Sequence, residues 1–132
     1  MVKNSNETEA LAIEEAAQMD RHFNDFHVAG FTYYDGVDVF AELKIGTELA
    51  FAAEPQNKYD NCAVAIYYKN YKLGYIPHGK NKYISKFLNF GHSGLFEVKI
   101  NRISPEEHPE QQISVVVKIK DITQKPKRKA AG

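Results

Sequence analysis

The sequence predicts a small, mainly β domain, a mostly antiparallel barrel of six strands, with one helix inside the domain and an amphipathic helix before it. A chain of 132 residues is long enough for one buried core and too short for two. Six short segments rich in β-branched and aromatic residues follow one another at hairpin-like spacing. One segment of helical period interrupts them.

An acidic amphipathic helix is expected over residues 7–23. Apolar side chains recur there at spacings of three and four residues, from Leu11 to Phe23, and Asn6 or Thr8 can cap the first turn. Such a helix packs on the domain or on a second copy of the chain, or it binds a partner. We therefore assign residues 1–25 to an N-terminal extension, and packing on a second copy would make a homo-oligomer through this helix.

The six strands are expected over residues 28–34, 48–54, 63–68, 71–76, 96–103 and 113–119. Turn formers at 35–36 end the first strand, and residues 55–61 form a polar loop. Residues 69–70 suit a two-residue hairpin, and Pro77 ends the strand that follows it. Alternating apolar residues in the last two strands predict one buried face.

The helix inside the domain is expected over residues 80–89, with its apolar side chains on one face and Lys82 and Lys86 on another, and Gly91 ends it. The domain itself is assigned to residues 26–121. Residues 122–132 are basic and are expected to form a disordered tail, which either adds affinity for phosphate or only solubility.

Composition argues against several classes of function. Lys and Arg number 17, as do Asp and Glu, so bulk positive charge does not hold this chain on nucleic acid, although a local basic patch can. The single Cys62 cannot form an internal disulfide or a thiolate zinc site, and no His pair has a ligand spacing. We expect no metal, no cofactor, no signal peptide, no membrane span and a cytoplasmic location.

The residue pattern favours binding over catalysis. An enzyme that uses Cys62 or a His–Asp pair on a phosphodiester lacks the spacing that would indicate a nucleophile and its base. Tyrosines at strand ends and in the polar loop can stack on bases, although surface tyrosine is also common without function. Asn57 and Asp60 can instead hold only their own loop, and Lys80 and Lys82 can be a solvated helix face.

The stretch from Phe26 to Lys120 resembles the HIRAN domain. The resemblance rests on VAGFTYY at 28–34, EPQNKYDNCAV at 54–64, KLGYIP at 72–77 and the helix that follows. Members occur at the N-terminus of SWI/SNF-type helicases that remodel stalled forks, and as stand-alone bacterial proteins. The resemblance implies a small OB-like six-stranded β-barrel and a non-enzymatic module that binds single-stranded DNA 3′ ends in repair or processing, alongside a helicase or nuclease.

The resemblance also implies roles for individual residues. Tyr33 and Tyr59 would sandwich a terminal base, and Asp60 would accept a hydrogen bond from the 3′-hydroxyl. Asn57 and Tyr34 would bond sugar, base or phosphate nearby. The remaining nucleic-acid-binding candidates, some of which replace charged residues of helicase-linked members, are Thr32, Tyr75, His78, Lys80 and Lys82.

Three of those positions depart from the helicase-linked pattern. Thr32 stands in place of an Arg, Tyr75 in place of a His and His78 in place of a Lys. Charged donors bind phosphate more strongly than neutral ones, so this chain is expected to hold phosphate less strongly than helicase-linked members do. The alternative is therefore a protein-interaction or oligomerisation module that keeps the fold without binding DNA, and the choice between DNA and RNA stays open.

Overall fold

The computed structural model describes residues 20–123, in which six strands and two α-helices form. The strands are β1 (His22–His27), β2 (Ala50–Ala53), β3 (Val64–Tyr68), β4 (Tyr71–Tyr75), β5 (Phe96–Ile103) and β6 (Ile113–Ile119), and the helices are α2 (Gly36–Val39) and α3 (Lys82–Asn89). Residues 22–119 make one compact unit. In the other unit, described only at 20–21 and 120–123, the backbone amide of Thr123 donates to Asp121.

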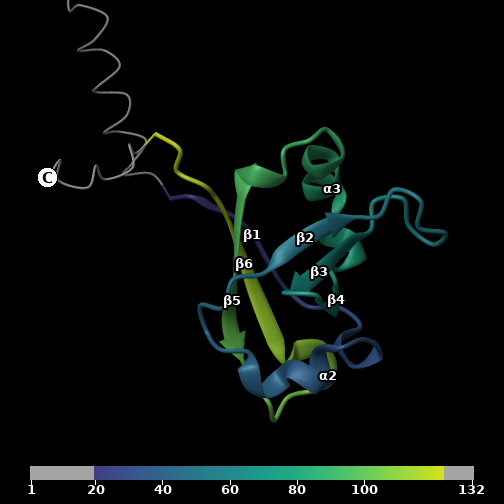
Figure 1. The fold of residues 1–132 in the computed structure, drawn as a ribbon, viewed down its shortest axis with the longest axis vertical. Helices are drawn as coiled ribbons and strands as arrows, with labels where there is room; N and C mark the ends of the chain where they lie inside the picture. The colour runs from purple at the N-terminus through teal and green to yellow at the C-terminus, as the bar shows by residue number, and fades with distance from the viewer. Residues whose placement is uncertain (1–19, 124–132) are drawn as a thin grey trace, which may run out of the picture. The chain divides into compact units, whose positions relative to one another are not determined.

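The strands pair antiparallel in two sheets of three, ordered β1-β6-β5 and β2-β3-β4 (Figure 1). Two isolated bridges, Ala29 with Tyr75 and Glu48 with Lys99, lie outside these strand pairings and connect the two sheets. The mainly β, antiparallel, six-stranded prediction is confirmed. A barrel closed by continuous ladders does not form, because the extended backbone at these two edges is only a few residues long.

The core fills the space between the sheets and helices with aliphatic and aromatic side chains. Phe96, Val98 and Ile100 of β5 are buried, as are Ile113, Val115 and Val117 of β6. Successive side chains of a strand point to opposite faces, so this alternation buries one face of the sheet, as the sequence predicted. Ile84 of α3 and Phe31 complete the same core.

The first expected strand, residues 28–34, is wrong. Gly30 adopts a left-handed conformation with φ of 73°, and residues Phe31–Tyr33 form a 3-10 turn. The first strand is β1 instead, where Phe26 is buried and pairs with Val115 of β6. The helix expected over 7–23 therefore does not extend over residues 20–23, because 20–21 are not helical and pairing with β6 overrides the helical spacing at 22–23. Residues 7–19 of that expected helix and most of the basic tail lie outside the described residues.

The other elements differ less from expectation. The hairpin at residues 69–70 is present, with Lys69 in the left-handed region at φ of 52°. Helix α3 begins two residues later than predicted, because His78–Lys80 forms a 3-10 turn. Helix α2 was not predicted. It needs Gly36, since a Cβ there would lie 2.3 Å from the ring of Phe31. In the described part of the chain, no helix is long and apolar enough to cross a membrane.

Candidate functional site

The loop between β2 and β3 is folded by its own polar side chains. Asn57 Oδ1 accepts hydrogen bonds from the backbone amides of Tyr59 (2.9 Å) and Asp60 (3.1 Å). Asn57 Nδ2 donates to Glu54 Oε1 at 3.0 Å, and Asp60 Oδ1 accepts from the amide of Cys62 at 2.8 Å. Such side-chain bonds fix a tight turn without a repeating element. The loop projects from the sheets in Figure 1, and the Tyr59 side chain that it carries is almost fully exposed.

Asp60 connects this loop to the segment before α3. Its Oδ2 accepts from Asn81 Nδ2 at 2.8 Å and pairs with His78 Nδ1 at 2.9 Å. The bond from His78, with help from Asn81 and the Cys62 amide, outweighs burial and lowers the pKa of Asp60. A carboxylate can only accept, so the proton of this pair lies on His78 Nδ1. Asp60 is therefore ionised at neutral pH.

A pocket of about 360 Å³ opens beside Asp60. Six of the predicted site residues line it, together with four others; the full lining is Ala29, Tyr34, Asn57, Tyr59, Asp60, Ala63, Tyr75, Ile76, His78 and Asn81. The sequence blocks around positions 28–34, 54–64 and 72–78 thus meet at one place. The pocket combines apolar walls, two amides and one carboxylate.

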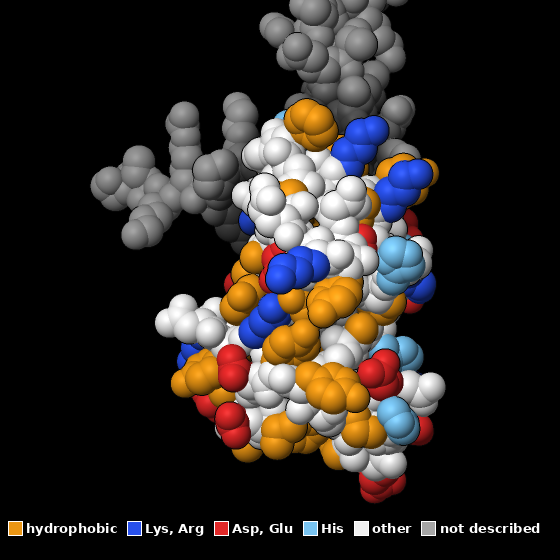
Figure 2. Space-filling model, turned by 90° about the vertical axis from the view of Figure 1, so that its right-hand side faces the viewer, with side chains coloured by type: hydrophobic (Ala, Val, Ile, Leu, Met, Phe, Trp, Pro, Cys, Tyr) orange, Lys and Arg blue, Asp and Glu red, His pale blue; other side chains and the backbone are white. Residues whose placement is uncertain are grey.

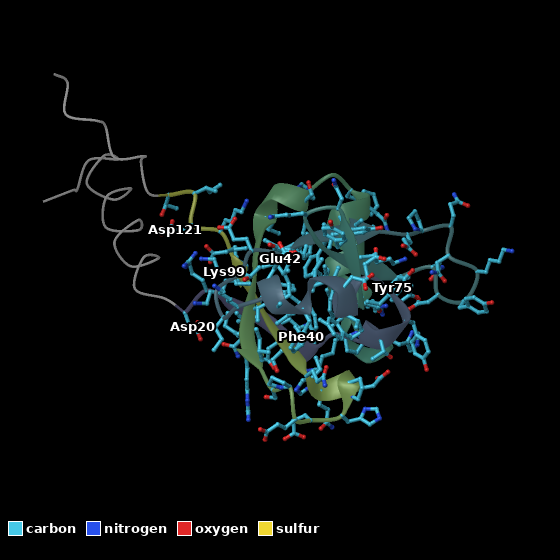
Figure 3. The ribbon with its side chains drawn as sticks, turned by 60° about the horizontal axis from the view of Figure 1, so that its bottom comes forward. Asp20, Phe40, Glu42, Tyr75, Lys99 and Asp121 are labelled. Carbon is cyan, nitrogen blue, oxygen red and sulfur yellow. The ribbon has the colours of Figure 1, made fainter. Side chains whose placement is uncertain are left out.

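One wall of the pocket is a cluster of Tyr34, Lys72, Tyr75 and Glu54. The rings of Tyr34 and Tyr75 meet edge to face, 5.5 Å between centroids. Lys72 Nζ lies 4.8 Å from the centroid of the Tyr34 ring and 4.3 Å from that of Tyr75. Tyr75 lies on the side of the unit from which the loop projects (Figure 3). A cation over two rings holds both in place.

The hydroxyl of Tyr75 is occupied within this cluster. It donates to Glu54 Oε1 at 2.8 Å and accepts from Lys72 Nζ at 2.5 Å. A phenol has one proton to donate, so no proton remains for a ligand while this bond lasts. Burial raises the pKa of Tyr75, with Glu54 adding to the effect. Tyr75 therefore acts as a wall of the pocket and not as a donor into it.

Four predicted residues do not line this pocket. Thr32 and Tyr33 are exposed on the 3-10 turn, and Tyr33 keeps 80% of its surface in solvent. Lys80 Nζ donates to the backbone oxygen of Asp25 at 2.8 Å and lines a separate pocket. Lys82 lines a third pocket, on α3.

The sequence reading missed three residues that build the site: Glu54, Lys72 and Asn81. Asn81 is only 2% exposed and stands just before α3, where asparagine normally caps the helix. Its side chain accepts no capping bond here, and its Nδ2 donates to Asp60 Oδ2 instead. An Asn next to a helix start indicates only a cap, and the partner of this one, Asp60, lies 21 residues away.

The side chains near the pocket do not gather in the way a metal site requires. Within residues 20–123, no group of three or more His, Cys, Asp or Glu side chains could hold a metal ion. Cys62 is partly buried and forms no disulfide. The arrangement suits binding of a small, partly apolar group that carries a hydroxyl or other donor.

Comparisons with known proteins agree with this architecture. The model of the HIRAN domain family matches residues 23–120. A crystal structure of a protein from Lactobacillus plantarum is similar at a TM-score of 0.64 and 20% identity, covering 75% of this chain and 93% of that one. The HIRAN domain of human HLTF is similar at a TM-score of 0.55 and 17% identity, covering 73% of each chain. No curated protein sequence matches.

Proposed function

Because the chain belongs to the HIRAN domain family, which is known for DNA-end binding, we propose that it binds the 3′ end of single-stranded DNA and catalyses no reaction. The observation that carries the proposal is the ionised Asp60 at the pocket beside the exposed Tyr59 ring. A terminal nucleotide offers the two matching features, a base that stacks and a free hydroxyl that donates.

Tyr59 supplies the stacking surface. Its side chain is 95% exposed at the tip of the loop, although the loop itself is tightly bonded. An exposed ring on a fixed backbone is prepared for a base, and each stacked base contributes about 1–3 kcal/mol. Tyr33 is the second exposed ring, and we propose that it covers the other face of that base.

Asp60 supplies the selectivity for a hydroxyl. An ionised carboxylate has about four acceptor positions, and the protein fills three of them with Cys62, His78 and Asn81. The remaining position can accept from a 3′-hydroxyl. A 3′-phosphate would bring negative charge to the same carboxylate and would be repelled.

The phosphate contacts of this site are weaker than the family pattern implies. Thr32 is neutral, and the hydroxyl of Tyr75 is already engaged in a hydrogen bond that it donates to Glu54. His78, which is 88% exposed, is the basic group that lines the pocket. We propose modest affinity that draws on Asn57 and Tyr34 for polar contacts, with Lys80 and Lys82 as further cations.

The same neutral positions favour a second candidate, a protein-interaction or oligomerisation module that keeps the fold. Deletion of residues 1–19, which ends before β1, would then change the oligomeric state while leaving the domain folded. A cytoplasmic role in DNA repair or processing, next to a helicase or nuclease, stays a prediction.

The test is fluorescence anisotropy with short labelled strands at about 50 and 200 mM salt. We expect a strand with a free 3′-hydroxyl to bind at both salts and a 3′-phosphate strand to bind at least tenfold more weakly. A 3′-blocked duplex and an RNA strand complete the series. Equal binding of both 3′ ends would overturn end recognition, and the absence of binding would favour the second candidate.

A further inference from the structure

The third pocket, which Lys82 lines, is a groove on the other side of the loop between β2 and β3. It has a volume of about 400 Å³, and its walls are the loop, at Asn61 and Cys62, and one side of α3. Each wall is next in sequence to a residue of the first pocket. Asn61 follows Asp60, and Lys82 follows Asn81. The bond between Asp60 and Asn81 therefore joins the residues that precede Asn61 and Lys82 in the two walls.

The charge of this groove is positive. Lys82 and Lys86 both line it and are exposed, and neither forms an ion pair with a residue that the structure describes. They stand one helical turn apart, at about 5–6 Å between their Cβ atoms. The described lining contains no carboxylate. By contrast, Lys80 is held by the Asp25 backbone and Lys72 by Glu54.

An aromatic ring and two amides complete the groove. Phe90, just after α3, lines it and is 75% exposed. Asn61 and Asn89 add side chains that can both donate and accept. Cations that alternate with exposed aromatic rings are the pattern by which proteins bind single strands without reading their sequence. Figure 2 views the face from which the loop projects, where blue cationic side chains lie among orange hydrophobic ones.

We propose that this groove, named here the α3 groove, binds the backbone of the same single strand whose 3′ end occupies the first pocket. Lys82 and Lys86 contact successive phosphates, and one base stacks on Phe90. This inference rests on the proposed end-binding function and extends it. In this arrangement, Lys82 and Lys86 replace the cations that are missing near the 3′ end, and they act on phosphates several nucleotides away from it. Affinity should therefore depend on strand length.

The first test compares strands of about three and about ten nucleotides, each with a free 3′-hydroxyl. The wild type should bind the longer strand at least tenfold more tightly. Lys82→Ala/Lys86→Ala should abolish that gain and reduce the slope of log affinity against log salt by about 1.4, for two phosphates of a single strand. Phe90→Ala should weaken the longer strand about tenfold and leave the shorter one unchanged.

The matched control is Lys44→Ala/Lys99→Ala, which removes two lysines that line none of the three pockets described. It should leave the length dependence and the salt slope unchanged. Equal loss in the control and in the Lys82/Lys86 variant would mean that net charge alone matters, and would overturn the α3 groove.

Cys62 provides a direct readout, because it is the single cysteine of the sequence and lines the groove. The ten-nucleotide strand should slow alkylation of Cys62 by iodoacetamide, and saturating three-nucleotide strand should not. If the short strand binds but the long strand neither gains affinity nor protects Cys62, the α3 groove is wrong and end binding stands. If the short strand does not bind, the proposed function itself fails.

Discussion

Asn81 donates its side-chain amide to the carboxylate of Asp60 over 2.8 Å, and this bond ties the start of α3 to the loop between β2 and β3. Asn81 is almost completely buried, while the carboxylate reaches the pocket. The residue that would meet the ligand is thus held by one that solvent hardly reaches.

Asn81→Ala should destabilise the domain. The substitution leaves Asp60 without one of its donors and empties a buried polar position, which costs about 1–3 kcal/mol of unfolding free energy. Urea denaturation followed by circular dichroism measures this. Asn101→Ala, at an exposed position, is the control and should change the free energy by less than about 0.5 kcal/mol. An unchanged free energy of unfolding in Asn81→Ala would show that the bond to Asp60 contributes nothing to stability.

Tyr59→Ala should separate binding from stability. The ring is exposed, so its loss should change the free energy of unfolding by less than about 0.5 kcal/mol. Binding of a 3′-hydroxyl strand should weaken by about 1–3 kcal/mol, because one stacked base is lost. Tyr59→Phe should restore binding, since it keeps the ring. Tyr71→Ala, outside the pocket, should bind as the wild type does, and a similar loss in that variant would contradict the assignment.

Asp60→Asn should remove the discrimination between 3′ ends. The substitution keeps the shape of the side chain and removes its charge, so a 3′-phosphate is no longer repelled. The ratio of the two Kd values should fall from at least tenfold toward one, as measured by anisotropy with paired strands. Asp38→Asn, an exposed residue of α2 that lines none of the described pockets, should keep the ratio. A ratio that persists in Asp60→Asn would assign end recognition to another group.

Strand positions were readable from the sequence wherever burial imposed a period of two. β5 and β6 agree with the expected residues because alternate side chains enter one core. β1 was not readable, since five of its six residues are exposed or half-buried and its place is set by pairing with β6. A helical spacing that continues to Phe23 was the stronger local signal, and it gave way to a contact about 90 residues along the chain.

The residues of the site also fall into those that the sequence could predict and those that it could not. Asn57 and Asp60 form bonds inside a loop of turn residues, so their local role could be predicted. The bonds from Asn81 and Lys72 reach residues about 20 positions away, and no spacing encodes them. Lys72 begins the block at 72–77 that carries the resemblance, but no site role was expected for it, and its position over two rings depends on how β4 packs against Tyr34.

Two acidic side chains of the site, Glu54 and Asp60, should make the stability of the domain depend on pH. Burial alone would raise the pKa of Glu54, but hydrogen bonds from Asn57, Tyr75 and Lys72 outweigh it and lower that pKa below its usual 4.5. The pKa of Asp60 is also lowered, from 3.8, chiefly by the bond from His78. A group whose pKa is lower in the folded state stabilises the fold above its unfolded pKa, and that stabilisation is lost as pH falls through the folded value.

The free energy of unfolding should therefore hold from pH 7 to about pH 5 with respect to these two groups, and decline below about pH 4.5. Glu54→Gln should lower it by about 1–3 kcal/mol at pH 7, because Lys72 loses its charged partner. The gap between this variant and the wild type should close as the pH falls below 4.5 and through the lowered pKa of Glu54. Glu106→Gln, in the exposed loop before β6, should follow the wild-type curve. A gap that stays constant down to pH 3 would mean that the Glu54 charge does not stabilise this wall of the pocket.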